Sequence, residues 1–268
     1  MMTMQPLIST TELAERLDEV VLNDIRWDLT DPNYGRHTYE TGHVPGAVFV
    51  DLDTDLASES GPGRHPLPDP SGFAETLGRL GIGAADEVVV YDDMKNTVSA
   101  RMWWMLRSIG HERVRVLDGG YQRWVDEGRP VDTGNVTRNG TTYPKVEFTG
   151  VATRHQLEDR PHIDARASAR YRGEYEPIDP KAGHIPAAIN IPATGNTAED
   201  GRFLGSNDLL RRFERIGENT VVSCGSGVNA CHNALAMVLA GLEMPEVYVG
   251  SFSEWSNLDL PISIGENP

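Results

Sequence analysis

Residues 42–47 read Gly-His-Val-Pro-Gly-Ala, and residues 183–188 read Gly-His-Ile-Pro-Ala-Ala. A second and looser pair follows, Leu-Asp-Gly-Gly-Tyr-Gln-Arg-Trp at 117–124 and Tyr-Val-Gly-Ser-Phe-Ser-Glu-Trp at 248–255. The two pairs are offset by 141 and 131 positions, far more than the period of a solenoid repeat. The chain is therefore predicted to contain two copies of one domain.

Each half of the chain alternates short apolar strands with helical stretches, which indicates an α/β fold with a mainly parallel sheet flanked by helices. Strands are predicted at 88–91, 162–164, 188–191, 220–223 and 246–249, and helices at 207–216, 229–240 and 252–255. The polar, Gly- and Thr-rich residues from about 132 to 150 are typical of a linker. We predict domains at 1–136 and 151–268, a linker at 137–150, and a ligand site in the cleft between the domains.

The composition excludes several classes of protein. The chain has 268 residues, 39% of them hydrophobic and 24% charged, as in soluble globular proteins. Its net charge of −16 at pH 7 disfavours nucleic acids and membrane surfaces as partners, so an anionic substrate needs a local group of arginines or amides. We see no signal peptide and no apolar stretch that could span a bilayer. Two cysteines are too few for a disulfide framework or a zinc ribbon, so we expect a cytoplasmic location and no metal.

The most informative segment is the loop that contains Cys224. Residues 221–230 read Val-Val-Ser-Cys-Gly-Ser-Gly-Val-Asn-Ala and lead into a predicted helix. A strand thus delivers Cys224 to the carboxyl edge of the sheet, where α/β proteins bind ligands. Gly225 and Gly227 allow the backbone to turn tightly around the sulfur, and the free N–H groups of the helix N-terminus favour negative charge on it.

Four interpretations of this loop compete. A Cys-x5-Arg phosphatase requires Arg at position 230, where the chain has Ala. Residues 225–230 also fit the dinucleotide-binding pattern G-x-G-x-x-A, but only 38 residues follow, and the acidic residue expected after the next strand is missing. The third is a thiolate that carries sulfur as a persulfide, and the fourth is a buried structural cysteine. The flanking glycines and the helix N-terminus favour the third over the fourth.

On this loop and on both Gly-His-Val/Ile-Pro motifs, the chain resembles the two-domain rhodanese-type sulfurtransferases, over nearly its whole length. The run Cys-Gly-Ser-Gly-Val-x-Ala resembles the 3-mercaptopyruvate sulfurtransferase branch, whereas in the thiosulfate branch basic residues usually follow the cysteine. The resemblance implies two rhodanese-like α/β domains, each with a mainly parallel central sheet, and no metal or organic cofactor. It also implies sulfur transfer from 3-mercaptopyruvate or thiosulfate, through a persulfide on Cys224, to cyanide or a thiol such as thioredoxin. A thiosulfate-preferring enzyme and a non-enzymatic scaffold remain alternatives.

The resemblance also implies a set of catalytic partners. Asp53 and His65, from the first domain, would face Cys224, and Ser226 would complete a relay that protonates the departing enolate of pyruvate. Each has a plain alternative: His65 as an exposed loop residue and Ser226 as a small residue in a tight loop. We expect Asp51 and Asp53 to alternate at the end of a strand, so that only one of them faces the cleft.

Substrate binding is implied for further residues. Arg170 aligns with the arginine that binds the substrate carboxylate in the family, and a planar guanidinium suits that geometry. A second arginine expected shortly afterwards has no clear counterpart in residues 176–181, where Lys181 could replace it. In the loop itself, the residues expected to bind substrate are Gly225, Gly227, Val228 and Asn229.

Other residues are expected to be structural. Asp92 occupies the position of Cys224 in the first copy, and since a carboxylate cannot hold a transferable sulfur, the first domain is predicted to be non-catalytic. Cys231 lies two helical turns beyond Cys224 and is expected to pack in the core. The two repeated histidines, His43 and His184, are expected to brace loops.

Overall fold

The computed structural model describes residues 4–266 and divides them into two compact units. Unit 1 consists of the described residues up to Ser58, with Pro68–Thr149 and Ala198–Phe203. Unit 2 consists of Glu59–Leu67, Gly150–Thr197 and the described residues from Leu204 onward. Each unit therefore includes a short segment from the other half of the sequence. No helix within residues 4–266 is both long and apolar enough to cross a lipid bilayer.

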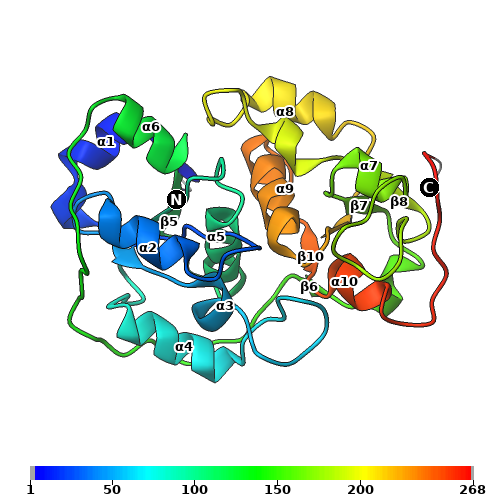
Figure 1. Cartoon of the computed structure of the whole chain (residues 1–268), viewed down its shortest axis with the longest axis horizontal. Helices are drawn as coiled ribbons and strands as arrows, with labels where there is room; N and C mark the ends of the chain where they lie inside the picture. Colours follow the sequence, from blue (N-terminus) through cyan, green and yellow to red (C-terminus); the bar gives the residue numbers. More distant parts are fainter. Residues whose placement is uncertain (1–3, 267–268) are drawn as a thin grey trace. The chain divides into compact units, whose positions relative to one another are not determined.

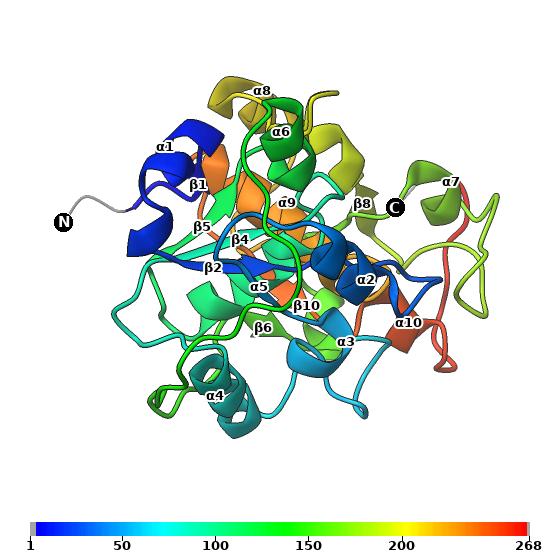
Figure 2. The same cartoon turned by 60° about the vertical axis from the view of Figure 1, so that its left-hand side comes forward.

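The sheet of unit 1 has five parallel strands (Figures 1 and 2). Their order across the sheet is β1 (Leu7–Ile8), β5 (Val114–Leu117), β4 (Val88–Tyr91), β2 (Val21–Asp24) and β3 (Val48–Phe49). The helices are α1 (Thr10–Glu15), η1 (Leu17–Glu19), α2 (Tyr34–Thr41), α3 (Leu52–Asp55), α4 (Pro70–Arg79), α5 (Ser99–Ser108) and α6 (Gly120–Asp126). All residues of β2, β4 and β5 are buried, as expected for a parallel sheet covered on both faces.

Unit 2 repeats this topology. Its five parallel strands run in the order β6 (Val151–Ala152), β10 (Glu246–Tyr248), β9 (Val221–Ser223), β7 (His162–Asp164) and β8 (Ala188–Asn190). Its helices are η2 (Arg154–Leu157), α7 (Ser168–Tyr171), η3 (Ala193–Asn196), α8 (Ser206–Arg212), α9 (Val228–Leu239) and α10 (Ser251–Trp255). The predicted α/β fold and the predicted duplication are confirmed.

A buried ion pair explains part of the sequence repeat. In unit 2, Arg166 pairs with Asp164 at 2.6 Å and donates to the carbonyl of Gly183 at 2.7 Å, while its guanidinium stacks on Phe252. Unit 1 repeats the arrangement with Arg26, Asp24, Gly42 and Tyr121. An unpaired buried charge would be costly, so this network fixes the glycine of each Gly-His motif against its sheet.

The repeated histidines brace loops, as predicted. His43 and His184 are fully buried, and the Nδ1 of each lies 2.8 Å from a backbone carbonyl, of Tyr39 and Tyr171 respectively. Each imidazole also stacks on the ring of the same tyrosine. These buried contacts therefore stabilise the fold of each unit.

The segment predicted as a linker, 137–150, contains no helix or strand, but it packs on unit 1 up to Thr149. The amide of Thr141 donates to the carbonyl of Gly78 at 2.9 Å, and the hydroxyl of Tyr143 lies 2.8 Å from Nδ1 of His111. The segment is thus anchored along its length.

The prediction that Asp51 and Asp53 alternate on a strand is wrong. Strand β3 ends at Phe49, and Asp51 is the N-cap of α3, where its carboxylate accepts from the amides of Asp53 and Thr54. Aspartate satisfies the free amides of a helix start, and this local contact ends the strand early.

Candidate active site

The loop after β9 encloses the sulfur of Cys224. Gly227 lies in the left-handed region with φ of +81°, where glycine is favoured, and its amide donates to Sγ of Cys224 at 3.1 Å. Cys224 is only 2% exposed. The sequence therefore places the sulfur of Cys224 near the N-terminus of α9, with a backbone donor directed at it.

The start of α10 holds this loop in place. The amide of Cys224 donates to Oγ of Ser251 at 3.1 Å, and its carbonyl accepts from the amide of Phe252 at 2.9 Å. The amide of Ser253 donates to the carbonyl of Gly225 at 2.8 Å. The second sequence repeat, at 248–255, is thus the segment that supports the loop.

Cys231 packs in the core, as predicted. It is fully buried in α9, and its thiol donates to the carbonyl of Gly227 at 3.1 Å. Neither Cys224 nor Cys231 is in a disulfide bond. Val228 and Asn229 form the first turn of α9, next to the loop.

The structure brings His65 and Ser226 together. Nδ1 of His65 lies 2.9 Å from Oγ of Ser226, and both residues are buried. This contact depends on the segment Glu59–Leu67, which we call the strap and which packs in unit 2. From the sequence, the segment was expected in the first domain. The amide of Arg64 donates to Oγ of Ser253 at 2.9 Å, and a Cβ on Gly63 would lie 2.4 Å from the carbonyl oxygen of Gly250.

Asp53 lies in unit 1, within α3. Its carboxylate accepts a hydrogen bond from Nε1 of Trp27 at 2.8 Å. The predicted cleft between the domains, and the part of Asp53 in it, stay predictions.

Arg170 belongs to a cluster of charges in unit 2. It donates through Nε and Nη2 to the carboxylate of Glu176, and through Nη2 to Oδ2 of Asp179 at 2.9 Å. Burial raises the pKa of Glu176, but hydrogen bonds from Arg170 and from the amides of Asp179 and Ile178 outweigh it, so the pKa lies below its usual range. Glu176 is therefore a carboxylate at neutral pH, and it holds the fork of Arg170.

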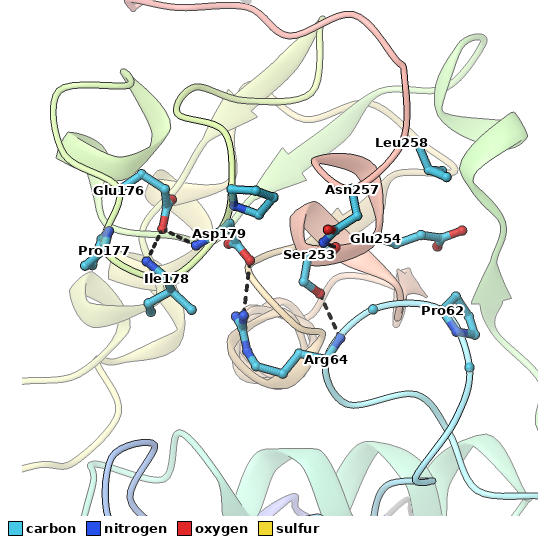
Figure 3. Close-up of a pocket in the computed structure, with 13 residues that line it drawn as sticks. Pro62, Arg64, Glu176, Pro177, Ile178, Asp179, Ser253, Glu254, Asn257 and Leu258 are labelled. Carbon is cyan, nitrogen blue, oxygen red and sulfur yellow. Dashed lines mark hydrogen bonds and ion pairs between the residues drawn. The ribbon is translucent and has the colours of Figure 1, made fainter.

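Arg64 is the residue that sequence reasoning missed. Its Nη1 pairs with Oδ1 of Asp179 at 3.1 Å (Figure 3). A Cβ on Gly225 would lie 3.3 Å from Nη2 of Arg64 and 3.6 Å from Nη1 of Arg170. Two guanidinium groups thus lie against the loop that carries Cys224, whereas the only sequence signal for Arg64 was its place next to His65.

Lys181 contributes elsewhere. Its Nζ donates to the carbonyl of Leu258 at 2.6 Å. The replacement of a second substrate arginine by Lys181 stays a prediction.

A cavity of about 780 Å³ borders the strap in unit 2 (Figure 3). It is lined by Gly61–Arg64, Glu176–Pro180, Ser253, Glu254, Asn257 and Leu258. Arg64 and its partner Asp179 are among these lining residues, whereas Arg170 and Cys224 are not. Among residues 4–266, no group of three or more His, Cys, Asp or Glu side chains is arranged to hold a metal ion.

In unit 1, Asp92 occupies the corresponding position after β4, and its carbonyl accepts from the amide of Tyr121, as that of Cys224 accepts from Phe252. Its fully buried carboxyl group accepts four backbone amides at 2.7–2.8 Å, those of Met94, Asn96, Val98 and Ser99. Burial raises the pKa of this carboxyl group, while the amides lower it. The loop of unit 1 is therefore filled by a side chain of its own.

These features define an α/β protein of two units with equivalent topology, one of which has a cysteine in a glycine-rich loop at a helix N-terminus. A model of the rhodanese-like domain matches residues 9–127 and 152–258. The chain belongs to the rhodanese-like family, and it is an enzyme of the sulfurtransferase class.

Three relatives illustrate the match. A probable 3-mercaptopyruvate sulfurtransferase of Pseudomonas aeruginosa is 39% identical over 99% of this chain and 100% of its own. A putative thiosulfate sulfurtransferase of Mycobacterium tuberculosis is also 39% identical, over 94% of each chain. The solved structure of 3-mercaptopyruvate sulfurtransferase from Leishmania major has a TM-score of 0.87 and 30% identity, over 96% of this chain and 75% of its own. The resemblance stated from the loop and the repeated motifs is confirmed.

Proposed function

We propose that the chain moves a sulfur atom from 3-mercaptopyruvate, or from thiosulfate, through a persulfide on Cys224, where it is sulfane sulfur, to a thiol or cyanide. The observation that carries the proposal is the amide of Gly227 directed at Sγ of Cys224, beside the buried pair of His65 and Ser226. A preorganised N–H donor stabilises negative charge on the sulfur before and after transfer. The relatives named for these two donors support the same chemistry.

In the first half-reaction the Cys224 thiolate attacks the sulfur of 3-mercaptopyruvate. A sulfur–sulfur bond forms, the carbon–sulfur bond breaks, and its electron pair leaves with the enolate of pyruvate. The hydrogen on the donor's sulfur stays on the new persulfide. Ser226, hydrogen-bonded to His65, supplies a proton to the enolate carbon and yields pyruvate.

In the second half-reaction an acceptor thiolate attacks the outer sulfur. The bond between that sulfur and Sγ breaks, the Cys224 thiolate is restored, and the acceptor leaves as a persulfide. A thiol protein such as thioredoxin, in a reducing cytoplasm, is the acceptor and setting that we propose.

The decisive experiment measures the intact mass of the reduced protein after incubation with either donor alone. The wild type should gain one sulfur atom, and Cys224→Ser should gain none. Cys231→Ser, which keeps a donor for the carbonyl of Gly227, is the matched control and should gain one. No gain by the folded wild type from either donor would contradict the proposal. The faster donor identifies the preferred substrate, and a strong preference for thiosulfate would favour the alternative function.

A further inference from the structure

We propose that Arg64, carried by the strap, binds the anionic end of the sulfur donor together with Arg170. The inference rests on the proposed function, because it names the group that recognises the donor at that site. Its premise is electrostatic. Both donors are anions, whereas the chain has a net charge of −16, so the cations that attract them must be local.

The position of Arg64 meets this requirement. Its Nη2 lies 3.3 Å from the point that a Cβ on Gly225 would occupy, and Nη1 of Arg170 lies 3.6 Å from the same point. Gly225 directly follows Cys224, so both groups lie against the residue next to the cysteine. Because Gly225 has no side chain, no Cβ fills the space in front of the two nitrogens.

The remaining contacts of both arginines leave the correct nitrogens available. Arg64 uses Nη1 on Asp179, and Arg170 uses Nε and Nη2 on Glu176 and Asp179. The nitrogens nearest to Gly225, Nη2 of Arg64 and Nη1 of Arg170, are not used in these ion pairs. Nε of Arg64 is buried and has no hydrogen-bond partner among residues 4–266. The side chain of Arg64 is 25% exposed, so a small anion can reach it.

Asp179 positions both arginines. Its buried carboxylate accepts from Arg64 through Oδ1 at 3.1 Å and from Arg170 through Oδ2 at 2.9 Å. One carboxylate therefore sets the spacing of the two forks.

The test uses two alkylating reagents of similar shape, anionic iodoacetate and neutral iodoacetamide. Their relative rates at Cys224, followed by peptide mass, report the local positive charge and do not require sulfur transfer. Arg64→Gln should slow iodoacetate about tenfold relative to iodoacetamide, the loss expected for one charge-assisted hydrogen bond. Arg64→Lys, which keeps a charge beside Asp179 but loses the fork, should lie between Arg64→Gln and the wild type.

The matched control is Arg160→Gln. Arg160 is also a half-buried partner of a carboxylate in unit 2, with Glu246 at 2.7 Å, but it precedes β7 and so lies at the opposite edge of the sheet. Its ratio of rates should equal that of the wild type. An unchanged ratio in a folded Arg64→Gln, or an equal fall in Arg160→Gln, would overturn the inference.

Steady-state kinetics links this anion site to the reaction. Arg64→Gln should raise KM for 3-mercaptopyruvate about tenfold and change kcat less, because the lost contact is present before and during the transfer. If the ratio of alkylation rates falls but the wild type accepts no sulfur from any donor, the anion site stands and the proposed function is the part that fails.

Discussion

At the scale of single residues, the contact of His65 with Ser226 bears on the proposed reaction. The hydroxyl of Ser226 lies within the loop, 2.9 Å from an imidazole nitrogen. A cysteine and a backbone donor suffice to hold a persulfide, but the proposed reaction with 3-mercaptopyruvate also requires a proton at carbon. Under the proposed function, the two donors should therefore depend differently on this hydroxyl.

We expect Ser226→Ala to lower kcat with 3-mercaptopyruvate about 100-fold, the usual contribution of a positioned acid. Sulfur transfer from thiosulfate to Cys224 should change little, because sulfite leaves without needing a proton at carbon. Rapid-mixing kinetics with each donor measures both rates. Ser206→Ala, at the exposed start of α8, is the control. Equal losses with both donors would show that Ser226 only shapes the loop.

At the scale of elements, the strap depends on one glycine. Gly63 has φ of +78°, and a Cβ there would meet the carbonyl oxygen of Gly250 at 2.4 Å and Oγ of Ser253 at 2.9 Å. Arg64 and His65 follow it directly. Crowding at Gly63 would therefore displace two side chains of the site at once.

Gly63→Ala should lower the free energy of unfolding by about 1 kcal/mol because of the left-handed backbone, and by a further ~1–3 kcal/mol because of the crowding. Gly241→Ala is the matched control, because Gly241 has φ of +82° with nothing within 4 Å of its Cβ position. It should cost only about 1 kcal/mol and keep full activity. Urea unfolding and sulfur transfer measure both variants. Similar costs and activities in the two would show that the strap is not held at Gly63.

The elements could be predicted from the sequence to a greater extent than the site. Strands β7 to β10 of unit 2 and helix α9 have local signals, namely apolar runs and a glycine loop before a helix, and the structure has them within a few residues of the expected bounds. The two-residue strand β6 was not predicted. The strap has no such signal, because it is held by contacts of Arg64 and His65 with residues 115 to 189 positions away. Asp51 shows the converse, since a local helix cap replaced an expected strand.

At the scale of the whole molecule, the two units share one fold and differ in their loops. Both sheets have the same strand order, and both units bury an arginine against the glycine of the Gly-His motif. The tryptophans of the second repeat, Trp124 and Trp255, both donate to a proline carbonyl at 2.7 Å. The sequence repeat therefore marks residues that stabilise the fold of both units, whereas the proposed sulfur transfer depends on residues that the two copies do not share.

Acid should weaken the fold through Glu176. Its pKa is lower in the folded chain than in an unfolded one, so its contribution is fully present above about pH 4.5 and is lost as the pH falls through the lower, folded value. Glu176→Gln should lower the free energy of unfolding by about 2 kcal/mol at pH 7. This difference in unfolding free energy from the wild type should shrink below pH 4.5. Urea unfolding across this range measures it, with the exposed Glu218→Gln as control. A difference that is constant with pH would contradict the assignment.

The carboxyl group of Asp92 also bears on the capacity of the molecule. It accepts four amides of the loop that corresponds to the Cys224 loop, and a carboxyl group cannot hold a transferable sulfur. Under the proposed function, one chain therefore carries at most one sulfur atom at a time, on Cys224. A second donor can then react only after an acceptor has removed the first sulfur, so the rate of discharge sets how soon the enzyme can be loaded again.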